Sequence, residues 1–360
     1  MLIFRYLAKE VLITLAALTA ILLLIFMSNQ LVQYLNRAVA GSIPAMIIMK
    51  LMMLELPNLI GLLLPLGFYI ALLVAYGRLY TDNEMIVLQA CGYGPKALFK
   101  HSFILSLMVS VIALVIMVWV SPMIATERAK LMKTSGLKTL IQTLTPGQFR
   151  QIPKGNEVFY VESMDKQHSK AKHVFLARQV LKQEGPQWDI LWAKEASVAT
   201  DPTTNLDYIQ LDSGQVYEGA PGQANYQVAA FKQYKTRLPT PVVSKLQDDI
   251  RTAPTIRLIQ TYTNNPARAA ELQWRFSVPI MVLVLTLIAV PLSRVNPRAG
   301  KYGKLLPAIL IYILYANFMF VSRNWMTQGK IPIWVGMNWL HFSVAFLGLV
   351  LIWRNRSQAI

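Results

Sequence analysis

The chain has 360 residues, of which 54% are hydrophobic and only 15% are charged. This composition is more apolar and less charged than that of an ordinary soluble protein of similar size, so it indicates a membrane protein. The formal net charge is +17. The basic residues gather at the ends of apolar segments, where they orient membrane spans and meet anionic headgroups, and this pattern argues against nucleic-acid binding.

Apolar stretches without charged residues fall into two groups of three, one at each end of the chain. A membrane span needs about 20 mainly apolar residues, and shorter spans are tolerated when flanking Arg or Lys side chains cover their ends. We predict six spans from the uncharged stretches at residues 11–36, 56–77, 102–126, 276–293, 305–322 and 331–353.

The basic residues of the short loops predict the orientation of these spans. Cytoplasmic loops carry an excess of Lys and Arg. If the N-terminus is cytoplasmic, the short outer loops carry only Arg37, Lys50, Arg323 and Lys330, and the inner segments carry most of the other basic residues that flank the spans. We therefore predict that both termini are cytoplasmic and that the long middle segment lies outside the cytoplasm.

The middle segment, residues 122–268, has a different sequence pattern. It opens with a polar helical stretch at 125–144 and changes at Thr145-Pro146-Gly147 to short runs with the period-two pattern of β-strands. Clusters of Pro, Gly, Asn and Asp separate these runs. The expected strands are residues 157–163, 173–180, 188–198, 206–212, 215–218 and 226–237.

Regularly spaced short strands of this kind predict an all-β sandwich or jellyroll-like domain. The fold class expected is thus an α-helical transmembrane protein with six spans, three plus three, and an inserted all-β domain. The predicted regions are 1–121 for the first three spans, 122–268 for the insert and 269–360 for the last three spans.

Sequence motifs for catalysis or cofactor binding are missing from the chain. It has no G-x-x-x-x-G-K-[ST] phosphate loop, no H-E-x-x-H, no G-x-S-x-G and no C-x-x-C pair. Its only cysteine, Cys91, has no histidine near it in sequence, so we interpret it as a packed small residue. We therefore expect no enzyme activity, no metal site and no cofactor in this chain.

Ionisable residues within membrane spans usually mark transport pathways. The strongest candidates are Glu55, at one end of the second span, and His341, within the sixth. We interpret both as structural, with Lys50 as a suitable partner for Glu55. Glu271 and Arg275 are four residues apart, so the sequence predicts an ion pair within one helix.

The cytoplasmic segment between the second and third predicted spans has the pattern of a short amphipathic helix. Thr81 or Asp82 is suited to cap it, Glu84 places a negative charge in its first turn, and Gly92 stops it. Its apolar residues recur at three-residue steps, at Met85, Leu88 and Cys91. A helix at 82–91 either docks into a groove on a soluble partner or simply connects two spans, and the sequence leaves both interpretations open.

Four segments of the chain together carry a resemblance to a known family. They are Phe4-Arg5-Tyr6-Leu7 with Glu10, the run Tyr80-Thr81-Asp82-Asn83-Glu84, the run Ala267-Arg268-Ala269-Ala270-Glu271-Leu272-Gln273-Trp274-Arg275, and the run Val290-Pro291-Leu292-Ser293-Arg294-Val295-Asn296-Pro297-Arg298-Ala299-Gly300. In combination they resemble the LptF/LptG family of lipopolysaccharide export permeases. The family layout of three spans, a periplasmic β-jellyroll and three more spans covers essentially the whole chain.

The resemblance implies the membrane half of an ATP-binding cassette transporter in the bacterial inner membrane. The implied partners are an LptG-like permease, an LptB-like ATPase dimer that uses the ATP, and an LptC-like periplasmic bridge protein, with lipopolysaccharide as the substrate. The helix at 82–91 then takes the role of a coupling helix. The residues implied to contact the ATPase are Asp82, Glu84, Met85 and Leu88.

Lipopolysaccharide carries phosphates, so an extraction site should combine an apolar cavity with basic residues at the outer rim of the membrane. The candidates for phosphate contact are Arg37, Lys50, Arg323 and Lys330, although each could instead anchor a helix end. Relatives often carry Lys or Arg near the outer end of span one, where this chain has Gln30 and Gln33. The alternative function is a non-transporting scaffold that anchors a periplasmic β-domain and recruits partners.

Overall fold

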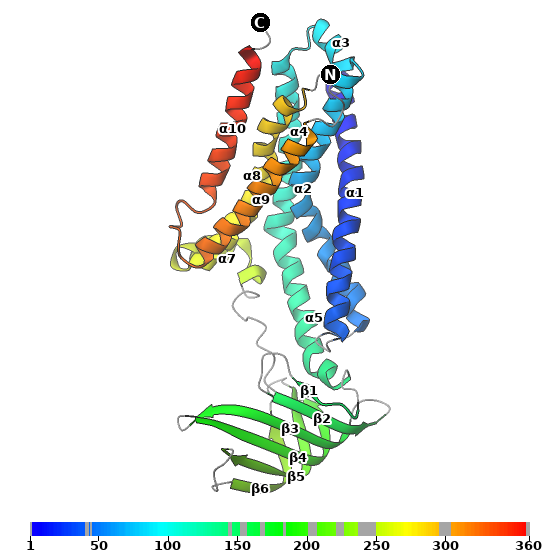
Figure 1. Ribbon diagram of the computed structural model, residues 1–360, viewed down its shortest axis with the longest axis vertical. Coiled ribbons are helices and arrows are strands. Elements are labelled where there is room, and N and C mark those ends of the chain that lie inside the picture. Colours follow the sequence, from blue (N-terminus) through cyan, green and yellow to red (C-terminus); the bar gives the residue numbers. More distant parts are fainter. Residues whose placement is uncertain are drawn as a thin grey trace. The chain divides into compact units, whose positions relative to one another are not determined.

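Figure 1 shows the computed structural model of the chain. It describes residues 2–39, 43, 45–142, 146–151, 157–165, 170–182, 185–200, 207–220, 227–236, 250–294 and 304–357. The chain forms two compact units. The helical unit comprises Met1–Leu31, Lys50–Arg128 and Leu246–Ile360, and the β unit comprises Val32–Met49 and Ala129–Lys245. Each unit has its own hydrophobic core.

Among the described residues, five helical segments are long and apolar enough to cross a membrane: Leu2–Val39, Ala45–Thr81, Pro95–Met132, Pro266–Leu292 and Leu305–Thr327. The first, second, fourth and fifth contain α1 (Leu2–Val39), α2 (Ile48–Thr81), α8 (Pro266–Leu292) and α9 (Leu305–Thr327). The third runs through α4 (Pro95–Val115), the π-helix η2 (Ile116–Val120) and α5 (Ser121–Gln142). The predicted class of a multi-pass helical membrane protein with an inserted all-β domain is confirmed.

The sixth predicted span is an apolar helix that begins later than expected. The sequence pattern predicted residues 331–353, whereas α10 comprises Asn338–Ser357. The residues before it form turns, because Pro332 cannot donate a backbone hydrogen bond and Gly336 has a left-handed φ of 45°. The described apolar part of α10, Asn338–Arg354, is shorter than each of the five membrane-length segments.

Helices α2 and α8 form the centre of the helical unit, and most of their membrane-length residues are buried, whereas few of those in α1 and α9 are. Prolines at positions 57, 65, 279 and 291 lie inside α2 and α8. Helices inside a membrane tolerate such residues when neighbouring groups satisfy the freed backbone carbonyls. The unit also contains the short helices α3 (Glu84–Ala90) and α7 (Thr255–Thr261) and the 3-10 helix η3 (Tyr262–Asn264).

The β unit contains one six-stranded antiparallel sheet in which each strand pairs with its sequence neighbours. The strands are β1 (Arg150–Gln151), β2 (Glu157–Met164), β3 (Lys170–Lys182), β4 (Gly185–Thr200), β5 (Asp207–Gly219) and β6 (Gln227–Thr236). The sequence pattern predicted a break between residues 212 and 215. That expectation is wrong, because β5 continues through Ser213 in a left-handed conformation with φ 52°.

The break in the pattern has a structural cause, which lies on a line across the sheet through His173, Lys194 and Ser213. On this line His173 and Ser213 adopt left-handed backbone conformations. The alternation of inward-facing residues shifts by one across it, so that Val174 and Ala171 both face the core, although they are three residues apart. Gly214 lies beside the line, and a Cβ there would come within 2.1 Å of the Trp192 carbonyl oxygen. Only glycine therefore allows this close approach of two strands.

Candidate functional site

The predicted coupling helix is present as α3, directly after α2. Its start differs from the prediction, because neither Thr81 nor Asp82 caps it. Asn83 occupies the N-cap position with a left-handed φ of 61° and no side-chain capping bond. Asn tolerates this conformation better than most residues, so the chain can turn sharply between the two helices. The predicted stop is confirmed, since Gly92 has φ 89° directly after the helix.

The structure places the four predicted coupling residues in two different environments. Met85 is fully buried, and Leu88 is partly buried against the same core. Asp82 and Glu84 are exposed. The large apolar residues that α3 exposes are instead Ile86 and Val87, which are 48% and 60% exposed.

Sequence reasoning missed Ile86 and Val87 because a three-residue apolar repeat identifies the face that packs on the chain's own core. Met85 and Leu88 thus attach α3 to the helical unit. The surface that α3 presents to solvent is formed by Asp82, Glu84, Ile86 and Val87. It combines carboxylates with two aliphatic side chains.

The surroundings of α3 include polar contacts with the first turns of α1. The Tyr6 hydroxyl donates a hydrogen bond of 2.6 Å to Oε2 of Glu84. One turn further along α1, Glu10 forms an ion pair with Arg78 in the last turn of α2. After α3, the buried Tyr93 places its hydroxyl 2.6 Å from Nδ1 of His101. Burial raises the pKa of Tyr93 to about 12, so its hydroxyl stays protonated at neutral pH.

The four basic residues predicted as phosphate contacts also differ in their surroundings. Arg37 lies exposed in the last turn of α1, Lys50 lies exposed near the start of α2, and Lys330 lies exposed after α9. Arg323 of α9 is only partly exposed, because its Nη2 lies 2.5 Å from Oε2 of Glu271 in α8. Its guanidinium carbon also lies 4.6 Å from the centre of the Trp274 ring, within the range of a cation–π contact. Arg323 is therefore held by α8.

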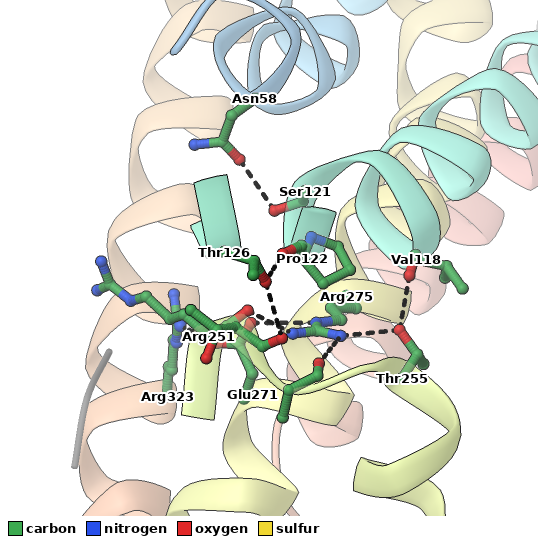
Figure 2. Close-up of polar contacts among 12 residues, drawn as sticks. Asn58, Val118, Ser121, Pro122, Thr126, Arg251, Thr255, Glu271, Arg275 and Arg323 are labelled. Carbon is green, nitrogen blue, oxygen red and sulfur yellow. Dashed lines mark hydrogen bonds and ion pairs between the residues drawn. The ribbon is translucent and has the colours of Figure 1, made fainter. Parts of the chain in front are cut away.

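Glu271 is shared between two arginines, as Figure 2 shows. Besides Arg323, it accepts a hydrogen bond of 3.1 Å from Nε of Arg275, so the predicted pair within one helix is confirmed. Arg275 is one of the most buried side chains of the chain, with 1% of its surface exposed. A buried charge is tolerated only when it is paired and its donors are satisfied.

Arg275 satisfies its other donors on the segment that precedes α7 (Figure 2). Its Nη2 donates to the Arg251 carbonyl at 3.0 Å, and its Nη1 donates to the Ala253 carbonyl at 3.0 Å and to the Thr255 hydroxyl at 2.8 Å. Arg275 and Glu271 thus form a clasp that attaches residues 251–255 to α8. We use the term Arg275 clasp for these four hydrogen bonds.

The Arg275 clasp extends to the π-helix of the third span. The Thr255 hydroxyl donates to the Val118 carbonyl at 2.7 Å, within η2. A π-helix leaves a backbone carbonyl without its usual partner, and such segments are frequent at functional positions. Thr255, the first residue of α7, supplies the partner. Its hydroxyl therefore joins the π-helix to the start of α7 and, through Arg275, to α8 (Figure 2).

Two further contacts join the start of α5 to α2. Ser121 donates to Oδ1 of Asn58 at 3.3 Å, as Figure 2 shows. Glu55, for which the sequence suggested Lys50 as a partner, forms an ion pair of 3.0 Å with Arg128. Glu55 is buried, so this pair lies where water screens it little.

His341 is buried in α10 and makes a contact that supports its structural interpretation. Its Nδ1 lies 2.5 Å from the hydroxyl of Tyr315 in α9, so the pair joins two apolar helices. Within the part of the chain that the structure describes, no three His, Cys, Asp or Glu side chains lie close enough to hold a metal ion. Cys91 is exposed at the end of α3 and forms no disulfide, so its interpretation as a packed residue is wrong.

Comparison with known proteins adds the family of the chain. The family model for the lipopolysaccharide export system permease LptF/LptG matches residues 5–354. The lipopolysaccharide export system permease protein LptF of Escherichia coli (strain K12) is 32% identical over 350 residues, which cover 96% of this chain and 94% of that protein. The LptF protein of Shigella flexneri matches with the same identity and coverage. The chain therefore belongs to the LptF/LptG family of lipopolysaccharide export permeases.

Proposed function

We propose that the chain is an LptF-type membrane subunit of an ATP-binding cassette transporter that extracts lipopolysaccharide from the inner membrane and passes it to a periplasmic bridge. The match of the family model from residue 5 to residue 354 carries this proposal, because it includes the spans and the β unit together. The two relatives named LptF match over nearly their whole length, which supports the same subunit type.

ATP hydrolysis is assigned in this proposal to a separate subunit, an LptB-like ATPase dimer. The chain lacks the phosphate-loop sequence that an ATPase needs. The further partners are an LptG-like permease, which forms a heterodimer with this chain, and an LptC-like bridge protein. The chain itself binds no cofactor in this proposal.

The orientation follows from the basic residues of the short loops. Both termini and α3 are cytoplasmic, and the insert at residues 122–268 is periplasmic, between the membrane regions 1–121 and 269–360. The excess of Lys and Arg in the predicted inner segments supports this orientation. It places α3 on the side where an ATPase has access to ATP.

The contact surface for the ATPase is the exposed side of α3. Asp82 and Glu84 supply carboxylates, and Ile86 and Val87 supply apolar area. Met85 and Leu88 contribute by fixing the helix to its own core. A short helix anchored by its apolar face and exposing a mixed face is suited to insert into a groove of a soluble partner.

Phosphate contact is assigned to the exposed basic residues at the periplasmic ends of the spans. Arg37, Lys50 and Lys330 are exposed and therefore accessible to an anionic headgroup. Arg323 is less accessible, because its ion pair with Glu271 holds the guanidinium against α8, although that pair uses only part of its five N–H donors. The four candidates thus divide into three exposed residues and one that is partly exposed and already paired.

Reconstitution tests the proposal. Vesicles that contain lipopolysaccharide, this chain, an LptG-like permease and an LptB-like ATPase are mixed with a soluble LptC-like acceptor and ATP. We expect lipopolysaccharide to transfer to the acceptor only when ATP is hydrolysed, and an ATPase variant that cannot hydrolyse ATP provides the control. The scaffold alternative predicts assembly of the same proteins with no transfer, so that result would reject the transport function.

A further inference from the structure

Helix α1 is attached to the helical unit mainly through its first four turns. The buried residues of α1 in this unit are Leu7, Val11 and Leu15. From residue 16 to residue 31, no residue of α1 is fully buried, although Leu18 is partly buried against the core. The attachment of the first span to the rest of its unit therefore depends strongly on contacts near the N-terminus.

The polar contacts at these turns lead to both sides of the junction between α2 and α3. Tyr6 and Glu10 are four residues apart and so lie on one face of α1. Tyr6 donates to Glu84, the first residue of α3, and Glu10 pairs with Arg78, in the last turn of α2. We call these four residues the α1–α3 latch.

The chemistry of the latch makes Tyr6 a hydrogen-bond donor and Glu84 an acceptor at neutral pH. The Tyr6 hydroxyl donates the hydrogen of this bond, and a carboxylate oxygen of Glu84 accepts it. A hydrogen bond to a charged acceptor is stronger than a neutral one. A carboxylate accepts at both oxygens, so the bond from Tyr6 to Oε2 is compatible with a second donor on Glu84 from a partner protein.

The position of α3 depends on the latch as well as on the buried Met85, because both hold its first turn. Asn83 interrupts the helical backbone between α2 and α3. After this break, Met85 anchors the apolar face, and Tyr6 holds the carboxylate of Glu84 on the exposed side. A displacement of α3 therefore acts on α1 through the Tyr6 bond as well as on the core through Met85.

We propose that Tyr6 is a positioning residue that orients Glu84 and transmits movement of α3 to the first span. This inference rests on the proposed function, in which an ATPase binds α3. Tyr6 would thus be one of the residues through which movement of the ATPase reaches the membrane. The first span is the element that receives this movement. The span is suited to move, because the fully buried residues of α1 in the helical unit end at Leu15 and none of residues 16–31 is fully buried.

The first experiment uses the full chain without partners and measures hydrogen–deuterium exchange of residues 84–92. Tyr6→Phe removes the hydroxyl and keeps the ring. We expect exchange to become about threefold to tenfold faster, the range that corresponds to loss of one exposed charge-assisted hydrogen bond. Tyr80→Phe is the control variant, because the Tyr80 hydroxyl also contacts α3, through a long bond of 3.4 Å from Gln89, but takes no part in the bond between Tyr6 and Glu84.

The second experiment uses the reconstituted complex and measures lipopolysaccharide transferred per ATP hydrolysed. Tyr6→Phe should leave assembly with the ATPase unchanged and lower this ratio severalfold, whereas Tyr80→Phe should leave it unchanged. Glu84→Gln keeps an acceptor for Tyr6 and should retain more of the ratio than Glu84→Ala. A residue needed only for folding would instead lower assembly and transfer together.

The latch is overturned if Tyr6→Phe changes neither the exchange of residues 84–92 nor the transfer ratio. It is also overturned if Glu84→Gln and Glu84→Ala lower the ratio equally, because the acceptor would then be irrelevant. Failure of the proposed function gives a different result: the wild-type complex would transfer no lipopolysaccharide, while the exchange experiment on the chain alone still tests the Tyr6 bond.

Discussion

Replacement of Arg275 by lysine tests whether the Arg275 clasp holds the segment before α7. Three of the four hydrogen bonds that Arg275 donates end on residues 251–255. A lysine can still pair with Glu271, but its single ammonium group does not reproduce the planar fork of a guanidinium. Arg275→Lys should therefore remove about three hydrogen bonds at roughly 1 kcal/mol each.

The expected loss is about 3 kcal/mol in the free energy that opposes local opening of the segment. Because 1.4 kcal/mol corresponds to a factor of ten, amide exchange of the peptide covering residues 250–262 should become about a hundredfold faster. The assay is hydrogen–deuterium exchange of the full chain in lipid nanodiscs, with Arg268→Lys as the control. Arg268 lies on the same helix, half-buried, and takes no part in the clasp.

The Arg275 clasp does not hold this segment if the exchange of residues 250–262 changes no more in Arg275→Lys than in Arg268→Lys. The same is true if exchange increases uniformly over the whole helical unit, because Arg275 would then contribute to general folding without holding this segment. A second variant, Thr255→Val, removes one hydroxyl at constant side-chain shape. It should accelerate exchange of η2 as well, since the Val118 carbonyl loses its partner.

Three further predictions follow from other contacts. Glu84→Arg should prevent stable pull-down of the LptB-like ATPase, since it reverses a charge on the exposed side of α3, and unchanged pull-down with full transport would contradict the assigned role. Gly214→Ala should destabilise the β unit by at least about 2 kcal/mol, because a Cβ meets the Trp192 carbonyl oxygen at 2.1 Å. Limited proteolysis should then cleave the β unit faster in this variant than in the control variant Ala229→Ser, which changes an exposed residue. A double-mutant cycle of Glu55→Gln and Arg128→Gln should give a coupling energy of about 1–3 kcal/mol in thermal unfolding. Strictly additive effects of the two substitutions would show that the ion pair does not contribute to stability.

Several features were accessible from the sequence because they depend on local composition. Membrane-length apolar runs and period-two strand patterns appear in the order of residues, so most of the spans and strands were predicted. The break expected within β5 was wrong because Gly214 in a strand resembles a turn signal. Its actual role is to let two strands approach closely, and this requirement arises only when the neighbouring strand is in place.

The start of α10 and the start of α3 show the limit of local patterns in the helices. Hydropathy continues through residues 331–337, but turns occupy them, and hydropathy does not distinguish an apolar turn from an apolar helix. Thr81 and Asp82 had suitable capping side chains, yet the chain turns at Asn83. Met85 is buried in the core, and its packing fixes where the chain leaves the direction of α2 and begins α3. The position of the N-cap at Asn83 therefore depends on tertiary contacts.

The apolar and charged patterns of the sequence by themselves determined a multi-pass membrane protein with an inserted β-domain, and the quoted motifs pointed to its family. The tertiary structure decided which side chains meet. Glu271 and Arg275 were predictable as neighbours on one helix, whereas the contacts of Arg275 with residues 251–255 and of Tyr6 with Glu84 join residues 20 to 78 positions apart. Such contacts depend on how the helices pack, and no repeat in the sequence records them.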